Sequence, residues 1–264
     1  MYSRSRLAQK YLRYYLTAAN GRGHGIHSPF VFDFIKKVLN DRRDYSAWSP
    51  IEDLRRALEQ DNTLLEIEDL GAGSVLQATR QRSIGSLARH AAKPKKLGRL
   101  LFRIAHYYQP KTILELGTSL GLSSSYLACG AANAKVYTIE GADAVAAVAE
   151  RNFRSLGLQT ELVRGNFDQQ IGPVLDRMGQ ADMAFIDGNH RKEPTLRYFN
   201  ALMERMAPSS VLIFDDIHWS REMEEAWELI REDGRVFLTI DLFFIGLVFL
   251  RDEFKIKQHF TIRF

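Results

Sequence analysis

The feature that most constrains this chain is an alternation of short apolar runs with amphipathic segments, which begins at Thr112 and continues toward the C-terminus. The apolar runs are rich in β-branched residues, which is typical of strands, and the segments between them have helical periodicity. Strands that alternate with helices form a parallel sheet with crossover helices on both faces. The expected strands are "TILEL", "KVYTIE", "TELVRG", "ADMAFID" and "SSVLIFDD".

Two further apolar runs, "RVFLTID" and "LFFIGLVFLR", follow the last expected helix with only a short turn between them. Runs this close must pair antiparallel, because a parallel crossover needs about a dozen residues or more. The sequence therefore predicts an α/β fold with a Rossmann-like, mostly parallel sheet of seven strands that ends in an antiparallel hairpin.

The first 110 residues follow a different pattern and are expected to be mainly helical. Ser28 is a typical N-cap and Pro29 a typical first helical residue, so we expect a helix from about Pro29 to Leu39. "SPIEDLRRALEQ" and "KKLGRLLFRIAHYYQP" indicate two more helices. We therefore expect a helical, substrate-side region over residues 1–110 and a ligand-binding domain over residues 111–264.

Positive charge is concentrated in the N-terminal region. Residues 70–114 contain no acidic residue, while arginine and lysine accumulate there. Clustered charge creates a field but does not by itself identify a partner. Two interpretations stay open, a solvated surface and the attraction of an anionic substrate.

Acidic residues lie at the carboxyl ends of several expected strands. In open α/β sheets, ligands bind beyond these strand ends. One strand with such an acid is weak evidence, but four strands share the feature. The residues are Glu115, Glu140, Asp187, Asp215 and Asp216.

The segment "ELGTSLG" after the first strand indicates the class of ligand. Gly117 and Gly121 permit a sharp turn and a close backbone approach, and a helix that begins near Ser123 offers its N-terminal amides. A nicotinamide dinucleotide site would have a glycine between them, which is missing here. Glu115 would repel a pyrophosphate but could accept a hydrogen bond from an ammonium group. The pattern therefore favours a nucleoside with a cationic amino-acid tail.

The stretch "ILELGTSLG" resembles the first motif of class I S-adenosylmethionine-dependent methyltransferases, especially the catechol and caffeoyl-coenzyme A O-methyltransferase group. The resemblance covers about residues 95 to 250. It implies that the acid and glycines of this turn contact the methionine part, that Glu140 binds the ribose hydroxyls, and that "GNFDQ" lines the adenine pocket. The residues expected to bind the cofactor are Glu115, Gly117, Thr118, Ser119, Gly121, Ser123, Glu140, Gly141, Asn166, Phe167 and Asp187.

The same resemblance implies a divalent metal site at Asp187, Asp215 and Asp216. Carboxylate oxygens suit Mg²⁺, Ca²⁺ or Mn²⁺, which would bind the acceptor's hydroxyls and ease their deprotonation. Asp216 departs from the group, which usually has an amide there. The alternative is that these acids cap loops or contact the cofactor without a metal.

A proton acceptor is expected three residues after the first metal acid, where the group has a lysine and this chain has His190. A neutral imidazole can accept a proton near neutral pH. Lys192 and His218 are the alternative bases. The expected catalytic residues are His190, Lys192 and Asp187.

A second glycine-containing segment, "IEDLGAGS", looks similar but is not followed by a strand that ends in an acid. We therefore interpret its turn at Gly71–Ser74 as a plain turn or part of a lid. His24 and His27 lie in a glycine-rich loop and are interpreted as helix-entry residues.

The resemblance thus implies a methyltransferase that uses S-adenosylmethionine, with a divalent cation, to methylate an oxygen of a small hydroxylated acceptor, and the basic N-terminal region leaves an anionic acceptor open. An RNA nucleoside methyltransferase and a non-catalytic binding module are the alternatives; no RNA-binding motif supports the first.

The single cysteine, Cys129, excludes an internal disulfide framework. Because no secretory signal or membrane span is evident, we expect a cytoplasmic protein without a membrane partner. The sequence leaves a homodimer open.

Overall fold

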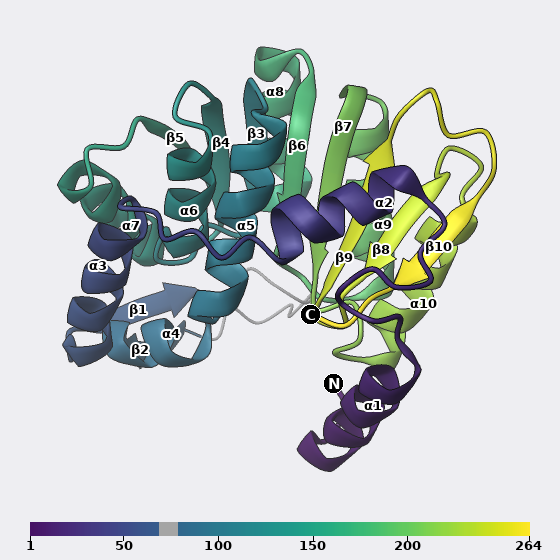
Figure 1. The fold of residues 1–264 in the computed structure, drawn as a ribbon. Coiled ribbons are helices and arrows are strands. Elements are labelled where there is room, and N and C mark those ends of the chain that lie inside the picture. Colours follow the sequence, from purple (N-terminus) through teal and green to yellow (C-terminus); the bar gives the residue numbers. More distant parts are fainter. Residues whose placement is uncertain (69–78) are drawn as a thin grey trace. The chain divides into compact units, whose positions relative to one another are not determined.

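The computed structural model describes residues 1–68 and 79–264. These residues form two compact units, one of residues 42–178 and one of residues 1–41 together with residues 179–264. Figure 1 labels the helices and strands of both units. The boundary that we expected at residue 110 lies inside the first of these units, and the functional division there stays a prediction.

The unit of residues 42–178 contains three parallel strands in the order β3-β4-β5. Its elements are α3 (Trp48–Gln60), β1 (Leu64–Glu68), β2 (Thr79–Ser83), α4 (Ile84–His90), α5 (Lys95–Tyr108), β3 (Thr112–Leu116), α6 (Leu122–Gly130), β4 (Lys135–Glu140), α7 (Asp143–Ser155), β5 (Thr160–Arg164) and α8 (Phe167–Met178). In the β3–β4 register, Glu115 lies opposite Thr138. This pairing brings the carboxyl ends of both strands to one edge.

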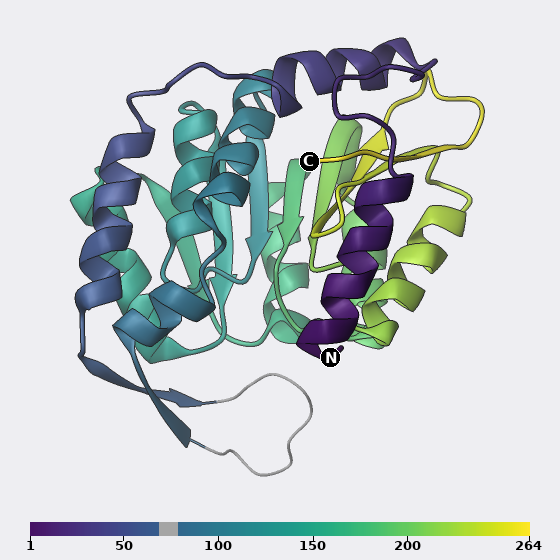
Figure 2. The ribbon, with the colours of Figure 1, turned by 60° about the horizontal axis from the view of Figure 1, so that its bottom comes forward.

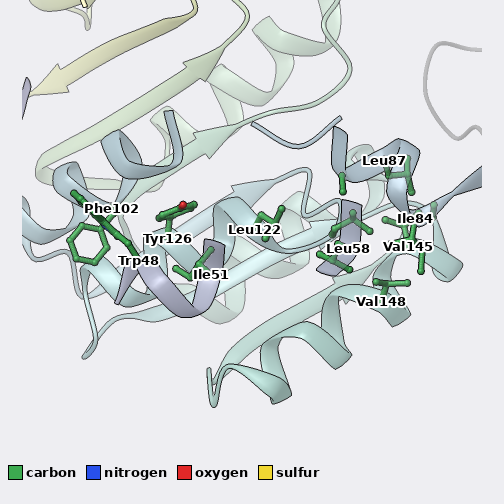
Figure 3. Close-up of a cluster of buried hydrophobic side chains, with 13 residues drawn as sticks. Trp48, Ile51, Leu58, Ile84, Leu87, Phe102, Leu122, Tyr126, Val145 and Val148 are labelled. Atoms are coloured by element: carbon green, nitrogen blue, oxygen red, sulfur yellow. The ribbon is translucent and has the colours of Figure 1, made fainter. Parts of the chain in front are cut away.

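Helices α3, α4, α5, α6 and α7 contribute to a shared hydrophobic cluster in this unit (Figure 3). Trp48 and Phe102 pack edge to face, with ring centroids 5.6 Å apart. Helix α5 approaches α6 closely at Gly98, where a side chain would collide with the Tyr126 ring. This packing fixes α6, the helix that follows the glycine-containing turn, against the helices around it.

The unit of residues 1–41 and 179–264 contains five strands in the order β10-β8-β9-β7-β6. Its elements are α1 (Arg4–Thr17), α2 (Pro29–Phe34), the π-helix η1 (Ile35–Leu39), β6 (Ala181–Ile186), α9 (Lys192–Met203), β7 (Met206–Asp215), α10 (Arg221–Glu232), β8 (Leu238–Asp241), β9 (Ile245–Leu250) and β10 (Gln258–Thr261). Strand β9 pairs antiparallel with both β7 and β8, whereas β6 pairs parallel with β7. The predicted terminal hairpin is therefore confirmed.

Helix α1 begins at an N-cap, Ser3, whose hydroxyl accepts a hydrogen bond from the Arg6 amide at 3.3 Å. It packs beside the C-terminal segment of its own unit (Figure 2). The hydroxyl of buried Tyr14 donates to the carbonyl oxygen of Ile262, and the Tyr14 ring lies 5.2 Å from the Phe243 ring. These contacts hold the N-terminal helix against the C-terminal part of the sequence within one unit.

The α/β class and the mostly parallel strands are confirmed, and the seven expected strands correspond to β3 through β9. Strand β10 adds one more, paired parallel with β8. The expected helix from Pro29 to Leu39 forms as α2 followed directly by η1. Helices α1 and α4 and the antiparallel pair β1–β2 were not predicted. Within the described ranges, no helix combines the length and the apolar character needed to cross a bilayer.

Candidate functional site

The turn between β3 and α6 has the backbone geometry of a close-approach loop. Gly117 has φ 103° and Gly121 has φ 79°, values that favour glycine, and Ser119 between them has φ 48°. The amides of Gly117 and Thr118 donate to the carbonyl oxygen of Ile139 at 3.0 and 3.2 Å. The turn is therefore attached to the end of β4. A side chain at position 121 would also meet the Phe153 ring, 2.6 Å from the added carbon.

Glu115 lies completely inside the protein, with 0% of its surface exposed. Its carboxylate accepts hydrogen bonds from the hydroxyl of Ser124 and, at 2.6 Å, from that of Thr138. The hydroxyls of Thr138 and Thr118 also lie 2.6 Å apart. These contacts join β3, β4, the turn and α6. Glu115 thus organises the turn from within, and its direct contact with a ligand stays a prediction.

Glu140 is only partly buried, at the end of β4. One carboxylate oxygen accepts from the Ser119 amide at 2.8 Å and the other from the Ala142 amide at 3.0 Å. A carboxylate oxygen can accept more than one hydrogen bond, so the ribose hydroxyls predicted for this position are chemically compatible with Glu140. Gly141 lies between Glu140 and Ala142 in this loop.

The loop after β5 lies beside the same strand end, because the Gly165 amide donates to the Glu140 carbonyl oxygen at 2.9 Å. The side chain of Asn166 accepts from the Asp168 amide at 2.8 Å, at the start of α8. Phe167 is the first residue of that helix. Three consecutive strand ends thus gather most of the predicted cofactor residues in one unit. Ser123 is buried in the first turn of α6.

The predicted catalytic residues Asp187 and His190 lie in the other unit, beside Asp215. Asp187 follows β6 and Asp215 ends β7, and the parallel register pairs Ile186 with Phe214, the residue before each acid. Ligand atoms of Asp187, His190 and Asp215 all lie within 4.8 Å of one another. His190 Nε2 is 3.6 Å from Asp187 Oδ1. Two carboxylates and one imidazole at this spacing can hold a divalent cation.

Asp216, the third predicted metal ligand, does not belong to this group of three. Its backbone has φ 54°, and its amide donates to the carbonyl oxygen of Phe244 at 2.7 Å. This left-handed backbone directs the chain away from the line of β7. Sequence reasoning assigned His190 only as a base and did not count it as a metal ligand.

His218, one of the alternative bases, is held between two carboxylates. Its Nδ1 lies 3.0 Å from Glu224 Oε1 and its Nε2 lies 2.8 Å from Asp241 Oδ2. Burial lowers the pKa of His218, but hydrogen bonds and charge from Asp241 and Glu224 raise it more, so the net shift is upward. Both ring nitrogens are engaged, which makes His218 a poor proton acceptor for a substrate.

Lys192, the other alternative, begins α9 and is also engaged. Its Nζ lies 3.2 Å from Glu225 Oε2, and its amide donates to Glu222 at 3.2 Å. These contacts tie α9 to α10. Among the three candidate bases, His190 alone belongs to the group with Asp187 and Asp215.

Glu224 connects this region with the N-terminal helix, a link that sequence reasoning missed. It accepts from the Tyr2 hydroxyl at 2.6 Å and from Lys10 Nζ at 2.9 Å. Burial raises the pKa of Glu224, but the hydrogen bonds from Tyr2, Lys10 and His218 lower it overall. No local pattern could have identified contacts between residues so distant in the sequence.

Two other sequence features lie away from these groups. The turn at Gly71–Ser74 lies outside the described residues. His24 and His27 are exposed in the loop before α2. Ser28 accepts from the Val31 amide at 3.5 Å and so caps α2 as predicted.

Comparison with known proteins relates this chain to methyltransferases. Residues 114–217 match the family model described as a methyltransferase domain. A catechol O-methyltransferase from Niastella koreensis is 30% identical over 158 residues, which cover 58% of this chain and 69% of that protein. A catechol O-methyltransferase from Mycobacterium tuberculosis is 29% identical over 46% of this chain and 54% of that protein.

Solved structures agree on the fold. The O-methyltransferase from Bacillus cereus in complex with SAH has a TM-score of 0.56 and 20% identity, over 83% of this chain and 97% of that one. An SAH-bound methyltransferase from Podospora anserina has a TM-score of 0.60 and 14% identity, over 85% and 97%. At these identities the likeness concerns the fold alone.

Proposed function

The chain belongs to the class I S-adenosylmethionine-dependent O-methyltransferases, the family of the catechol O-methyltransferases, and on that premise we propose that it methylates an oxygen of a small hydroxylated acceptor with the help of a divalent cation. The observation that carries the proposal is the group formed by Asp187, His190 and Asp215. S-adenosylmethionine is the methyl donor. The RNA and non-catalytic alternatives are not favoured, because the relatives are small-molecule methyltransferases by name.

The cofactor half of the reaction belongs to the loops after β3, β4 and β5. Glu140 would accept the ribose hydroxyls, and the amides of the turn from Gly117 to Gly121 would approach the amino-acid part. Buried Glu115, through its hydrogen bonds with Ser124 and Thr138, would hold that turn in the binding conformation before the cofactor arrives. A preformed turn lowers the entropy cost of cofactor binding.

In methyl transfer the bonds form and break between the acceptor and the cofactor, and not on the protein. A lone pair of the acceptor oxygen forms the new bond to the methyl carbon, the carbon–sulfur bond breaks, and its electron pair stays on sulfur as a neutral thioether. The acceptor's proton leaves to a base or to solvent. Alignment and the exclusion of water therefore provide most of the rate enhancement.

The residues present fit a divalent cation. Asp215 is buried, whereas the side chains of Asp187 and His190 are 15% and 29% exposed, so the group is closed on one side and accessible on the other. When bound, a cation would make the acceptor hydroxyl more acidic. We propose His190 as the third ligand in place of Asp216. An imidazole among the ligands favours Mn²⁺ over Mg²⁺.

Calorimetric titration with Mn²⁺ tests this assignment. We expect Asp187→Asn and His190→Ala each to weaken Mn²⁺ binding at least tenfold, because the first removes a negative charge from the ligands and the second removes the imidazole, while binding of S-adenosylhomocysteine is unchanged. Asp182→Asn, at the start of the same strand β6, is the matched control and should bind Mn²⁺ like the wild type.

The pattern of loss separates the two roles of His190. If His190→Ala keeps full Mn²⁺ affinity but loses about 10²- to 10⁴-fold in turnover of catechol, His190 is the general base and not a ligand. If both variants bind Mn²⁺ as tightly as the wild type, the metal proposal is wrong.

A further inference from the structure

Helix α1 presents an outer face whose large apolar side chains are mostly exposed, although Arg263 lies over the Tyr15 ring, 5.0 Å from its centroid. Its opposite face is firmly held: Tyr14 is buried, Tyr11 packs edge to face on Phe243 at 5.1 Å, and Lys10 pairs with Glu224. The helix therefore has a fixed rotation about its axis. The side chains on its outer face therefore stay exposed to the surroundings.

The outer face carries large apolar side chains. Leu12 and Leu16 are 58% and 69% exposed, and Tyr15 beside them is 50% exposed. Positions 12 and 16 are one helical turn apart, so the two leucines form a continuous strip with Ala8 one turn before them. Single exposed leucines are common, but an aligned strip on one helix indicates a binding surface.

Basic side chains flank the strip. Arg4, Arg6 and Arg13 are exposed on the same helix, and Arg22 is exposed in the loop that follows. The first acidic residue of the sequence is Asp33, so nothing in residues 1–32 offsets this charge. The strip and its arginines together make a basic amphipathic surface.

We propose that the outer face of α1 attaches the protein reversibly to an anionic lipid surface, with Leu12 and Leu16 inserted among the acyl chains and the arginines at the level of the headgroups. A helix of 14 residues with this polarity lies in the interface and does not span the bilayer. The proposal revises the expectation of no membrane partner, which concerned a spanning segment.

Two other occupants fit the surface less well. A second copy of α1 would bring the arginines of both helices together with no acid on either helix to pair with them, and like charges at close range repel. A nucleic acid would match the arginines, but its phosphates offer nothing to an aliphatic strip. A bilayer with acidic headgroups satisfies both features at once.

Co-sedimentation of the full-length protein with vesicles tests the proposal. We expect binding to phosphatidylcholine vesicles that contain phosphatidylglycerol, weak binding to phosphatidylcholine alone, and release at high salt. Arg13→Gln combined with Leu16→Gln should reduce binding at least about tenfold, since one cation and one inserted side chain are lost.

A matched control is available in the same unit. Lys255→Gln combined with Ile256→Gln also removes one exposed cation and one exposed aliphatic side chain, since Ile256 is 74% exposed, but away from α1. This control should bind like the wild type, and circular dichroism should show both variants folded. Equal loss in both double variants, or wild-type binding by the α1 variant, would overturn the proposal. It would also be overturned by a dimer that dissociates in the α1 variant without any vesicle binding.

Discussion

At the scale of single residues, two glutamates that the sequence assigned to different parts of the cofactor also differ in their surroundings. Glu115 is enclosed and bonded to two hydroxyls, whereas Glu140 is partly exposed and bonded to two backbone amides. Sequence reasoning identified both because each stands at a strand end. It could not predict which of them is enclosed, because burial depends on the neighbouring strand and helix. We infer that Glu115 preserves the turn and that Glu140 contacts the ligand.

Replacing Glu140 by Ala should therefore lower the affinity for S-adenosylhomocysteine at least about tenfold, because the ligand loses charge-assisted hydrogen bonds and the turn loses its anchor at Ser119. Glu150→Gln on α7, an exposed residue paired with Arg164, is the control and should bind normally. Calorimetry measures both. Unchanged affinity in Glu140→Ala would place the ribose elsewhere.

At the scale of elements, the strands were predictable as short apolar runs and the crossover helices as the amphipathic segments between them. Helix α1 was not, since its apolar partners, Phe243 and the Ile262 segment, lie at the other end of the sequence. Strand β10, "QHFT", is short and polar, so nothing in its pattern distinguishes it from a loop. The position of Asp216 outside the acid group depends on a left-handed backbone at a residue that is not glycine.

The attachment of α1 through Glu224 makes a prediction about stability. Glu224→Gln should lower the free energy of unfolding by about 1–3 kcal/mol at neutral pH, because His218 and Lys10 lose a partly buried carboxylate. The pKa of Glu224 is lowered in the folded protein, so its contribution is full above the ordinary value of 4.5 and is lost as the pH falls through the folded value.

Urea denaturation at several pH values follows this contribution. The difference between wild type and Glu224→Gln should be largest near neutral pH and should shrink below about pH 4.5. Glu228→Gln on the exposed side of α10 is the control, with an effect below about 0.5 kcal/mol. A difference that is constant across this pH range would show that Glu224 acts by packing and not by charge.

At the scale of the whole molecule, the cofactor loops belong to one compact unit and the acid–imidazole group to the other. The sequence located Asp187 and Asp215 because strand ends mark ligand sites in any open α/β sheet, but it counted Asp216 and not His190 as the third metal ligand. It could not identify the acceptor, whose pocket depends on loops and helices without a shared pattern. The proposed function requires that both groups serve one reaction, so the decisive test must observe the transferred methyl group itself.

That test is incubation of the full-length protein with S-adenosylmethionine labelled with ¹³C in its methyl group, together with Mn²⁺ and catechol, the probe acceptor used in the turnover test above. We predict a new ¹³C resonance of a methyl group bonded to oxygen, its loss in the presence of a chelator, and its recovery when Mn²⁺ is restored. A methyl group bonded to nitrogen or carbon, or undiminished transfer to oxygen in the chelator, would contradict metal-assisted O-methylation.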